Sequence, residues 1–565
     1  MNLTDLLKKG YFPQELPPPF NTESFADNYA KAKVEWDKFD NAIKASYSET
    51  KYISISIPKV GFSRRFLGVP NPIHFGALSE VICSNWNAIK NIYDQSKLSA
   101  SKPIPNGSKG RAVKTIMTFG QFKKQCLIDS FDKIYELRTD ISKYYPSIYT
   151  HTIPWAIHTK ATAKAKRQDL SMLGNQLDKF VHQAQSGQTI GVPIGPDTSL
   201  ILSEILGCTF DKQLKTKFPF IKGYRYVDDY YLYFSSQADA ERVFKFLQTI
   251  LTDFTLIINE EKTTIKKFPF EFEAEWTIAL NDFAISEKPK SKGNDIFNFV
   301  SLAFKYSNCY PKDSVLKWAI KKLAATPIEK ENWELYESLI FKMALSEPAI
   351  LPDLTKILVT YRNFVSKRKL ASLIKELLTI HITKGHSFEV SWTLWIAKTF
   401  SVKIAKKMAD SIFASNDFVS ILIALDLKAN KLISSNTSNL IKELELASFK
   451  DERWLFVYEA IFKKWLRPTK SDLLLKSKYF MTLKKLNVSF YDPNRQVDEI
   501  NFPKTQKKIP KTYSKTESTN VKVTKLNLSD LLKKLKENKQ KQNIADKKAT
   551  STATNIALAY MPGDE

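Results

Sequence analysis

The sequence has only four cysteines in 565 residues, at Cys83, Cys126, Cys208 and Cys309. They stand far apart and show none of the close pairing that zinc fingers need. We therefore expect no zinc module, and reduced thiols of the kind that a cytoplasm maintains.

Long apolar runs are also lacking, and acidic residues are outnumbered by basic ones. No run has transmembrane length, and residues 1–4 begin no signal-peptide pattern, so we expect no membrane association and a cytoplasmic location. Lysine and arginine number 85 against 59 acidic residues, which gives a net charge of +26. This charge predicts a polyanionic partner, most simply nucleic acid. The hydrophobic content of 43% is enough for real cores, and the length predicts about three or four domains.

One short stretch, residues 224–234, organises the chain. Aromatic and β-branched residues flank the adjacent Asp228 and Asp229. The pattern predicts a strand, a tight turn and a strand, with both carboxylates at the tip. Such carboxylates can hold divalent cations, although an ordinary hairpin with a polar turn has the same local pattern.

Three further stretches carry candidate chemistry. A predicted strand over residues 134–140 ends at Asp140, a rigid position for a metal ligand. Residues 187–199 form a Gly- and Pro-rich loop, and Asp197 to Ser199 can cap the apolar helix that follows at residues 200–208. A loop entering a helix can bind phosphate, but most such caps are structural. A predicted strand and turn over residues 256–263 presents Lys262.

The first part of the chain offers possible phosphate contacts. The proline cluster of residues 12–20 is predicted to be extended and to wrap another domain, and residues 51–58 alternate as a half-buried strand. Arg64 and Arg65 follow and suit phosphate, because guanidinium binds it in a fork; a solvated surface pair is the alternative. The loop of residues 99–111 flanks a phosphate path or is simply a surface loop.

From about residue 332 the chain becomes a series of amphipathic helices. Their recurrence in pairs every 35–40 residues or so predicts a HEAT-like solenoid. His381 and His386 stand apart from other ligand residues, and we predict no ligand role for them. Residues 501–550 contain 14 lysines and four acidic residues, and they predict a disordered linker followed by a short basic amphipathic helix from residue 526.

Together these motifs resemble the polymerase core of reverse transcriptases over about residues 50–275. Asp140 with Tyr145 is similar to the first palm motif, residues 193–199 to the second, and residues 226–229 to the metal-binding hairpin. Residues 259–263 are similar to the lysine-bearing motif that follows. Val227 before the paired aspartates is typical of reverse transcriptases, since viral RNA-copying RNA polymerases usually have glycine there.

A finer resemblance is to bacterial defence-associated reverse transcriptases of the abortive-infection, AbiK-like group. It rests on residues 10–18, 149–155 and 193–199. Intron-encoded relatives typically carry Pro-x-Gly-Ser-Pro in the second motif, from which Pro196-Asp197-Thr198 departs, and we find no Cys-rich nuclease region. Both observations count against a mobile-element enzyme.

The resemblance implies an α+β fold: a fingers–palm core, an all-α helical-repeat domain and a basic tail. The expected divisions are an N-terminal wrapping segment (1–50), fingers (51–135), a palm with the catalytic motifs (136–275), a thumb-like helical region (276–330), the helical-repeat domain (331–490), a basic linker (491–525), and a short basic helix with a flexible tail (526–565).

The resemblance also implies two-metal nucleotidyl transfer with Mg²⁺, or alternatively Mn²⁺. Asp140 and Asp228 are the expected bridging ligands, with Asp229 and the carbonyl of Ile141 as further ligands. Tyr145 is expected to lie under the sugar and to exclude a 2′-hydroxyl, although a core aromatic is the alternative. The remaining candidates are expected to hold the triphosphate, the leaving pyrophosphate, the nascent base pair or the template, and they are Lys59, Arg64, Arg65, Arg111, Pro193, Gly195 and Lys262. For Lys262, which would protonate or steady the pyrophosphate, an ordinary surface lysine is the alternative.

The resemblance thus implies a metal-dependent DNA polymerase in antiphage defence, primed by a protein hydroxyl, and either untemplated or copying a dedicated noncoding RNA. Expected partners are dNTPs, a DNA product that can be covalently attached to the protein, and further copies of the chain in a homo-oligomer. Tyr560 is a candidate priming residue. The alternatives are a conventional reverse transcriptase of a mobile element, and a non-catalytic nucleic-acid or phage sensor on a polymerase fold.

Overall fold

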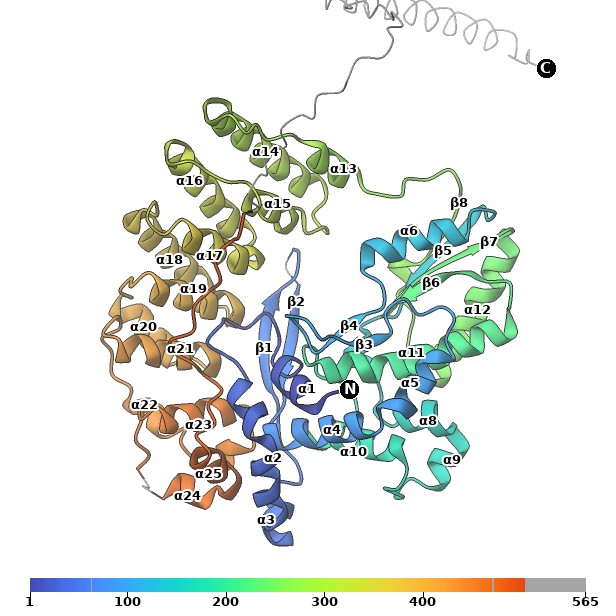
Figure 1. Ribbon diagram of the computed structural model, residues 1–565, viewed down its shortest axis with the longest axis horizontal. Coiled ribbons are helices and arrows are strands. Elements are labelled where there is room, and N and C mark those ends of the chain that lie inside the picture. Colours follow the sequence, from blue (N-terminus) through green and yellow to red (C-terminus); the bar gives the residue numbers. More distant parts are fainter. Residues whose placement is uncertain (62, 470–471, 503–565) are drawn as a thin grey trace, which may run out of the picture. The chain divides into compact units, whose positions relative to one another are not determined.

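A four-stranded antiparallel sheet carries the paired aspartates (Figure 1). The structure, a computed structural model, describes residues 1–61, 63–469 and 472–502, and Met1–Phe502 cluster as one compact unit. The sheet order is β6-β7-β5-β8, with β5 (Tyr135–Asp140), β6 (Lys222–Tyr226), β7 (Asp229–Phe234) and β8 (Thr264–Lys267). The predicted strand, turn and strand over residues 224–234 are confirmed as β6 and β7, with Val227 and Asp228 in the turn.

Helices surround this sheet and connect its strands. The helices of the first half are α1 (Leu3–Lys9), α2 (Glu23–Asp37), α3 (Asn41–Ser46), α4 (Pro72–Ser84), α5 (Trp86–Asp94), α6 (Phe119–Asp129), α7 (Tyr144–Ser147), α8 (Thr152–His158), α9 (Lys160–Ala165), α10 (Leu173–Gln183), α11 (Asp197–Lys217) and α12 (Gln237–Asp253). Two short hairpins complete this half, β1 (Ile53–Pro58) with β2 (Arg64–Val69) and β3 (Pro103–Pro105) with β4 (Val113–Thr115).

Both faces of the sheet are buried. Successive side chains of a strand point to opposite faces. Tyr230, Leu232 and Phe234 of β7 therefore lie in one core with residues of α11 and α12, whereas Tyr231 and Tyr233 lie in another with α6. Figure 1 shows α6 and α12 beside the sheet. The hairpin tip consequently rests on a support that is packed from both sides.

Residues 256–263 depart from the predicted strand and turn. Ile258 forms only an isolated bridge with Ile141, and the next residues form the 3₁₀ turn η1 (Glu260–Lys262) before β8. Ser142 N donates to Ile257 O at 2.8 Å, and Asn259 N donates to Asp140 O at 2.9 Å. These two bonds tie the segment to the end of β5, so Lys262 is held beside the aspartates by a turn instead of a strand.

The β1–β2 hairpin confirms the strand predicted over residues 51–58. Ile53, Ile55 and Ile57 are buried, and β1 packs against a helix of the second half, α19 (Ser387–Thr399). Gly68 N donates to Ile194 O at 2.8 Å, which joins β2 to the Gly- and Pro-rich loop. The hairpin therefore contacts both halves of the chain.

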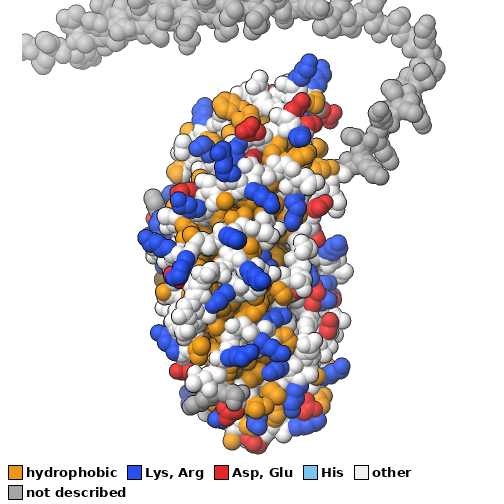
Figure 2. All heavy atoms as spheres, turned by 90° about the vertical axis from the view of Figure 1, so that its left-hand side faces the viewer, with side chains coloured by type: hydrophobic (Ala, Val, Ile, Leu, Met, Phe, Trp, Pro, Cys, Tyr) orange, Lys and Arg blue, Asp and Glu red, His pale blue; other side chains and the backbone are white. Residues whose placement is uncertain are grey.

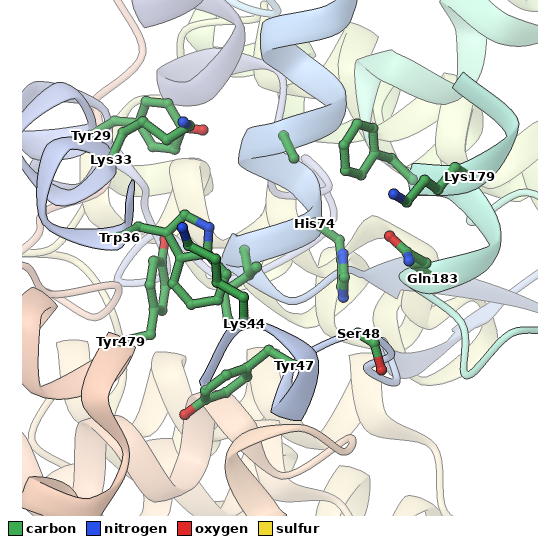
Figure 3. Close-up of a pocket in the computed structure, with 13 residues that line it drawn as sticks. Tyr29, Lys33, Trp36, Lys44, Tyr47, Ser48, His74, Lys179, Gln183 and Tyr479 are labelled. Carbon is green, nitrogen blue, oxygen red and sulfur yellow. The ribbon is translucent and has the colours of Figure 1, made fainter. Parts of the chain in front are cut away.

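The N-terminal segment also contacts both halves. Residues 12–20 are not simply extended as predicted, because backbone bonds from Leu16 to Pro13 and from Phe20 to Pro17 fold them into two turns. Tyr11 Oη donates to Pro70 O at 2.5 Å, and Trp392 Nε1 donates to Glu15 O at 2.7 Å. A cavity of about 340 Å³ lies between α2, α3, α4, α10 and the helix of Tyr479, and the residues that line it include Trp36, Tyr47, His74, Lys179 and Tyr479 (Figure 3).

The second half is helical, as predicted. Its helices are α13 (Glu275–Asp282), α14 (Pro289–Cys309), α15 (Val315–Ala324), α16 (Lys330–Ser346), α17 (Leu351–Thr360), α18 (Lys367–His381), α19 (Ser387–Thr399), α20 (Lys406–Phe413), α21 (Phe418–Ala429), α22 (Ser438–Ile441), α23 (Trp454–Phe462), α24 (Leu473–Lys476) and α25 (Lys478–Lys485), with the 3₁₀ turns η2 (Pro348–Ile350) and η3 (Ala447–Phe449). The HEAT-like repeat remains a prediction. Lys and Arg side chains are spread over the face of this region that Figure 2 shows.

Three features predicted from the sequence lie beyond residue 502. The short basic helix predicted from residue 526, the end of the basic linker and Tyr560 all lie outside the described residues. Within the ranges that the structure describes, no helix has both the length and the apolarity needed to span a bilayer.

A buried carboxyl group fastens the end of the described chain to α23. Glu459 is fully buried, its Oε1 accepts from Phe490 N at 2.5 Å, and its Oε2 accepts from Ser489 Oγ at 3.1 Å. Burial raises the pKa of Glu459 from 4.5 to about 7. The folded state therefore binds this proton more tightly than the unfolded chain does, and this contribution to stability is lost as the pH rises from 4.5 through about 7.

We expect Glu459→Gln to flatten the fall in melting temperature over that pH range, because the amide keeps both bonding groups and does not titrate. Differential scanning calorimetry of the wild type and the variant between pH 4.5 and about 7 measures how steeply each melting temperature falls. The difference between the two proteins isolates this residue from the other titrating groups. Equal slopes in the two proteins would contradict the prediction.

Candidate active site

The three aspartates converge at the end of the sheet. Asp140 is the last residue of β5 and pairs in register with Asp229, the first residue of β7. Asp228 occupies the turn between β6 and β7, and its carbonyl accepts from Ile141 N at 3.2 Å. Residues 88 positions apart in sequence thus meet because the two strands are hydrogen-bonded neighbours.

The electrostatics of this group fit a bound cation. Burial, with the nearby charge of Asp140, raises the pKa of Asp228. Burial and the charge of Asp228 raise the pKa of Asp229 to about 6. Asp140 Oδ1 is buried and has no hydrogen-bond partner among the described residues. Crowded carboxylates with an unsatisfied oxygen are the donor set that a hard divalent cation prefers, so the residues present fit the metal that the motif implies.

Lys262 is brought to the same place. Its ammonium group forms an ion pair with Asp140. Burial lowers its pKa, but the hydrogen bond and the charges of the three aspartates raise it more, and the net pKa lies above the ordinary value. The lysine therefore stays protonated next to the carboxylates.

Tyr145, which belongs to α7, lies beside the three aspartates. Ser203 Oγ donates to its hydroxyl at 3.4 Å, and Val192 N donates to its carbonyl at 2.9 Å. Burial raises the pKa of Tyr145, and the charge of Asp228 adds to the shift. The ring is thus neutral and close to Asp228, at the position that the motif assigns to sugar recognition.

Pro193 and Gly195 are held by tight packing. A Cβ added to Gly68 of β2 would stand 2.6 Å from Cβ of Pro193. Gly195 has φ +122°, and a Cβ there would stand 2.6 Å from Cγ of Pro13. Glycine is required at position 195 for both reasons, because other residues rarely adopt this φ and there is no room for a side chain.

The basic residues of the β1–β2 hairpin point to different places. The Arg64 guanidinium forms a two-pronged ion pair with Glu389 of α19, so the structure does not bring it to the aspartates. Arg65 is exposed. Its positive charge lowers the pKa of both Asp228 and Tyr145, so Arg65 lies on the same side of the hairpin as the aspartates. Lys59 is exposed near the hairpin tip.

Arg111 and Asp197 form an internal clamp. Arg111 donates to Asp197 Oδ1 at 2.6 Å and to the carbonyls of Phe12 and Gly195 at 2.5 and 2.6 Å. The other oxygen of Asp197 accepts from Ala112 N at 2.9 Å. Asp197 therefore does not cap α11 as predicted, since its carboxylate is engaged outside the helix and Pro196 is the N-cap. The Arg111 guanidinium is used within the fold.

A buried ion network under the hairpin was missed by the sequence reasoning. Arg225 is fully buried and donates to Glu204 and Asp211, each at 2.9 Å. It also donates to Val227 O at 2.7 Å, while Ser101 Oγ accepts from Val227 N at 2.7 Å. Val227 has φ +57°, an unfavourable conformation for a β-branched residue, so these contacts hold the turn that presents Asp228. The available signal was an arginine between two tyrosines in a predicted strand, since a cation that such a strand buries requires buried anions.

Comparison with known proteins agrees with this geometry. Residues 73–288 match the family of reverse transcriptases (RNA-dependent DNA polymerases), a range that contains every aspartate of the site and Lys262. A search of curated proteins finds no match. Among solved structures, the chain is similar to telomerase from Candida albicans in complex with the TWJ fragment of telomeric RNA, at 12% identity over 71% of this chain and 70% of that one; the TM-score of 0.28 is too low to support an argument. Residues 73–288 therefore form a reverse transcriptase domain, and the enzyme class of the chain is RNA-directed DNA polymerase.

Proposed function

We propose that this chain is a divalent-metal-dependent DNA polymerase that acts in antiphage defence by abortive infection. The observation that carries the catalytic part is the convergence of Asp140, Asp228 and Asp229, with a buried Asp140 oxygen that lacks a partner among the residues described. Clustered carboxylates at a strand end are costly unless a cation neutralises them.

Mg²⁺ or Mn²⁺, when bound, would lower the pKa of the attacking hydroxyl and neutralise the leaving pyrophosphate. Asp140 and Asp228 would hold the ions, and Asp229 and the Ile141 carbonyl would add oxygen ligands. Protonated Lys262 places a positive charge where the pyrophosphate leaves. The Tyr145 ring blocks a 2′-hydroxyl by steric clash, which selects dNTPs.

A cleft next to the sheet supports a nucleic-acid path. It has a volume of about 700 Å³ and includes Arg138, which lies two residues before Asp140 on β5 and whose charge lowers the pKa of Asp229. Trp276 and Trp318 add rings to its wall. Ammonium groups bind phosphates and rings stack on bases, so the cleft suits a primer–template duplex or a single strand. The lysines that line it are Lys123, Lys312, Lys317 and Lys321, and the acidic lining residues are Glu271, Glu273 and Asp313. Lys123 pairs with Glu273 at 3.2 Å, and with Arg138 included the basic residues still outnumber the acidic ones.

The defence role rests on the resemblance of residues 10–18, 149–155 and 193–199 to abortive-infection reverse transcriptases. The same resemblance supports protein priming, either without a template or on a dedicated noncoding RNA. It also supports a homo-oligomer that works in the bacterial cytoplasm. The DNA product would then be covalently joined to a tyrosine or another hydroxyl of the chain. A conventional mobile-element reverse transcriptase and a non-catalytic sensor are the competing functions.

The test uses purified protein, Mg²⁺ and labelled dNTPs without added template or primer. We expect labelled DNA that migrates with the protein until protease is added, because the first nucleotide would be joined to a protein hydroxyl. An Asp228→Asn/Asp229→Asn variant is the matched control and is expected to give no product. RNase treatment before the reaction shows whether a bound RNA serves as the template.

Other outcomes favour the competing functions. Product that forms only with an added RNA–DNA primer pair contradicts protein priming and supports a conventional reverse transcriptase. Equal defence against phage by the wild type and the double variant, with no product from either, supports the sensor.

A further inference from the structure

Two histidines that stand apart from other ligand residues in the sequence meet a glutamate at the junction of α18 and α19. His381 is the last residue of α18, His386 directly precedes α19, and Glu389 lies in the first turn of α19. The turn between the helices reverses the chain and brings the three side chains together. The sequence-based prediction of no ligand role for these histidines did not foresee this arrangement.

The distances match a tetrahedral metal site. His381 Nδ1 and His386 Nδ1 are 2.9 Å apart, and His386 Nδ1 and Glu389 Oε1 are 3.6 Å apart. One potential ligand atom from each of the three residues lies within 4.8 Å of the other two. Two ligands bound to one zinc ion at the usual bond lengths stand roughly 3.3 Å apart. These two separations fall on either side of that value, and the ligand atoms of His381 and Glu389 are no more than 4.8 Å apart. Side-chain adjustments that bring this third pair closer would complete the geometry.

Both imidazoles favour the neutral form that binds metals. Burial lowers the pKa of His381 to about 4, and burial together with the charge of Arg64 lowers the pKa of His386. The two Nδ1 atoms face each other, so at most one of them carries a proton, and a metal ion would replace that single hydrogen bond. Neutral imidazole nitrogen is the most common metal ligand in proteins.

The surroundings support the ligands. Arg64 of β2 holds both oxygens of Glu389, because Oε1 accepts from Nη1 and Oε2 accepts from Nη2 at 2.8 Å. A metal ion on Oε1 would share that oxygen with the guanidinium, and carboxylates that bind metals are commonly oriented by such a second partner. An adjacent cavity of about 210 Å³ is lined by His386 and Asp417. It has room for a water molecule as a fourth ligand. The Asp417 carboxylate itself caps α21, where it accepts from Ser420 N at 3.2 Å.

We infer that His381, His386 and Glu389 bind one zinc ion or a similar borderline divalent cation. Two nitrogens and one carboxylate suit Zn²⁺, Co²⁺ or Ni²⁺, whereas Mg²⁺ prefers oxygen ligands alone. The site is separate from the polymerase aspartates. Through Arg64 the ion would connect the α18–α19 junction to the β1–β2 hairpin, so it would stabilise the contact between this hairpin and the helical region.

The test is metal analysis of the full chain, purified without a histidine tag, stripped with chelator and reconstituted with Zn²⁺ in excess Mg²⁺. We expect roughly one zinc ion per chain and a higher melting temperature after reconstitution. His386→Ala and Glu389→Gln are expected to weaken zinc binding at least about tenfold. Co²⁺ substitution gives a second readout, because a tetrahedral site produces visible absorption bands that the variants should lose.

Two control variants distinguish this site from others. His151→Ala removes a partly exposed histidine that pairs with Asp178 at 2.6 Å, and it should keep the zinc. Asp228→Asn should also keep it, since the proposed ion does not sit on the polymerase aspartates. Zinc at background level in the reconstituted wild type, or zinc that survives both His386→Ala and Glu389→Gln, would overturn the inference and leave a hydrogen-bonded histidine pair.

Discussion

Replacing Asp140 by asparagine is expected to lower the rate of nucleotide incorporation at least about a thousandfold, which corresponds to ~4 kcal/mol of transition-state stabilisation. Asp140 contributes a buried oxygen without a partner among the described residues, and its other oxygen pairs with Lys262. The amide has the same shape but lacks the charge, so it would bind a divalent cation poorly. It would also leave Lys262 without its counter-ion.

The measurement is single-turnover incorporation of labelled dNTP at saturating Mg²⁺, under whichever priming condition supports wild-type synthesis. Asp132→Asn is the matched control. Asp132 lies shortly before β5, is 45% exposed and pairs with Lys133, so the same chemical change there should leave the rate within about twofold. Unchanged melting temperatures would show that both variants are folded. An Asp140→Asn protein with more than a tenth of the wild-type rate would contradict the metal-ligand role.

Arg225→Met is expected to be the most destabilising single substitution in the reverse transcriptase domain, at about 3–5 kcal/mol. Glu204 and Asp211 are both fully buried, and Arg225 is the cation that compensates them. Methionine fills much of the same volume but leaves the two carboxylates uncompensated. The loss of the bond to Val227 O would also release the turn that presents Asp228.

Thermal unfolding followed by calorimetry, together with the soluble fraction on expression, measures this effect. Arg242→Met on α12 is the control, because Arg242 pairs with Asp239 on the surface and its side chain is 66% exposed. That change should alter stability by no more than about 0.5 kcal/mol. Similar melting temperatures for the two variants would contradict the assigned role of the buried network.

The sequence alone determined most of the elements and the location of the catalytic candidates. The aromatic and β-branched runs around Asp228 predicted β6 and β7, and the amphipathic spacing after residue 332 predicted the helices from α16 to α23. Both signals depend on neighbours within a few residues, which is the range over which side-chain periodicity sets a helix or a strand. Asp140 was found in the same way, at the end of a predicted strand.

The tertiary structure decided the partner of each charged side chain. Arg64 binds Glu389, which is 325 residues away, and Arg111 binds Asp197 and the N-terminal carbonyls, so two predicted phosphate contacts are used inside the fold. His381 and His386 meet because of one interhelical turn. An isolated charge in a sequence fits phosphate, solvent or an ion pair equally well, because its energy depends on which opposite charge the fold brings within a few ångströms and on how much water remains between them.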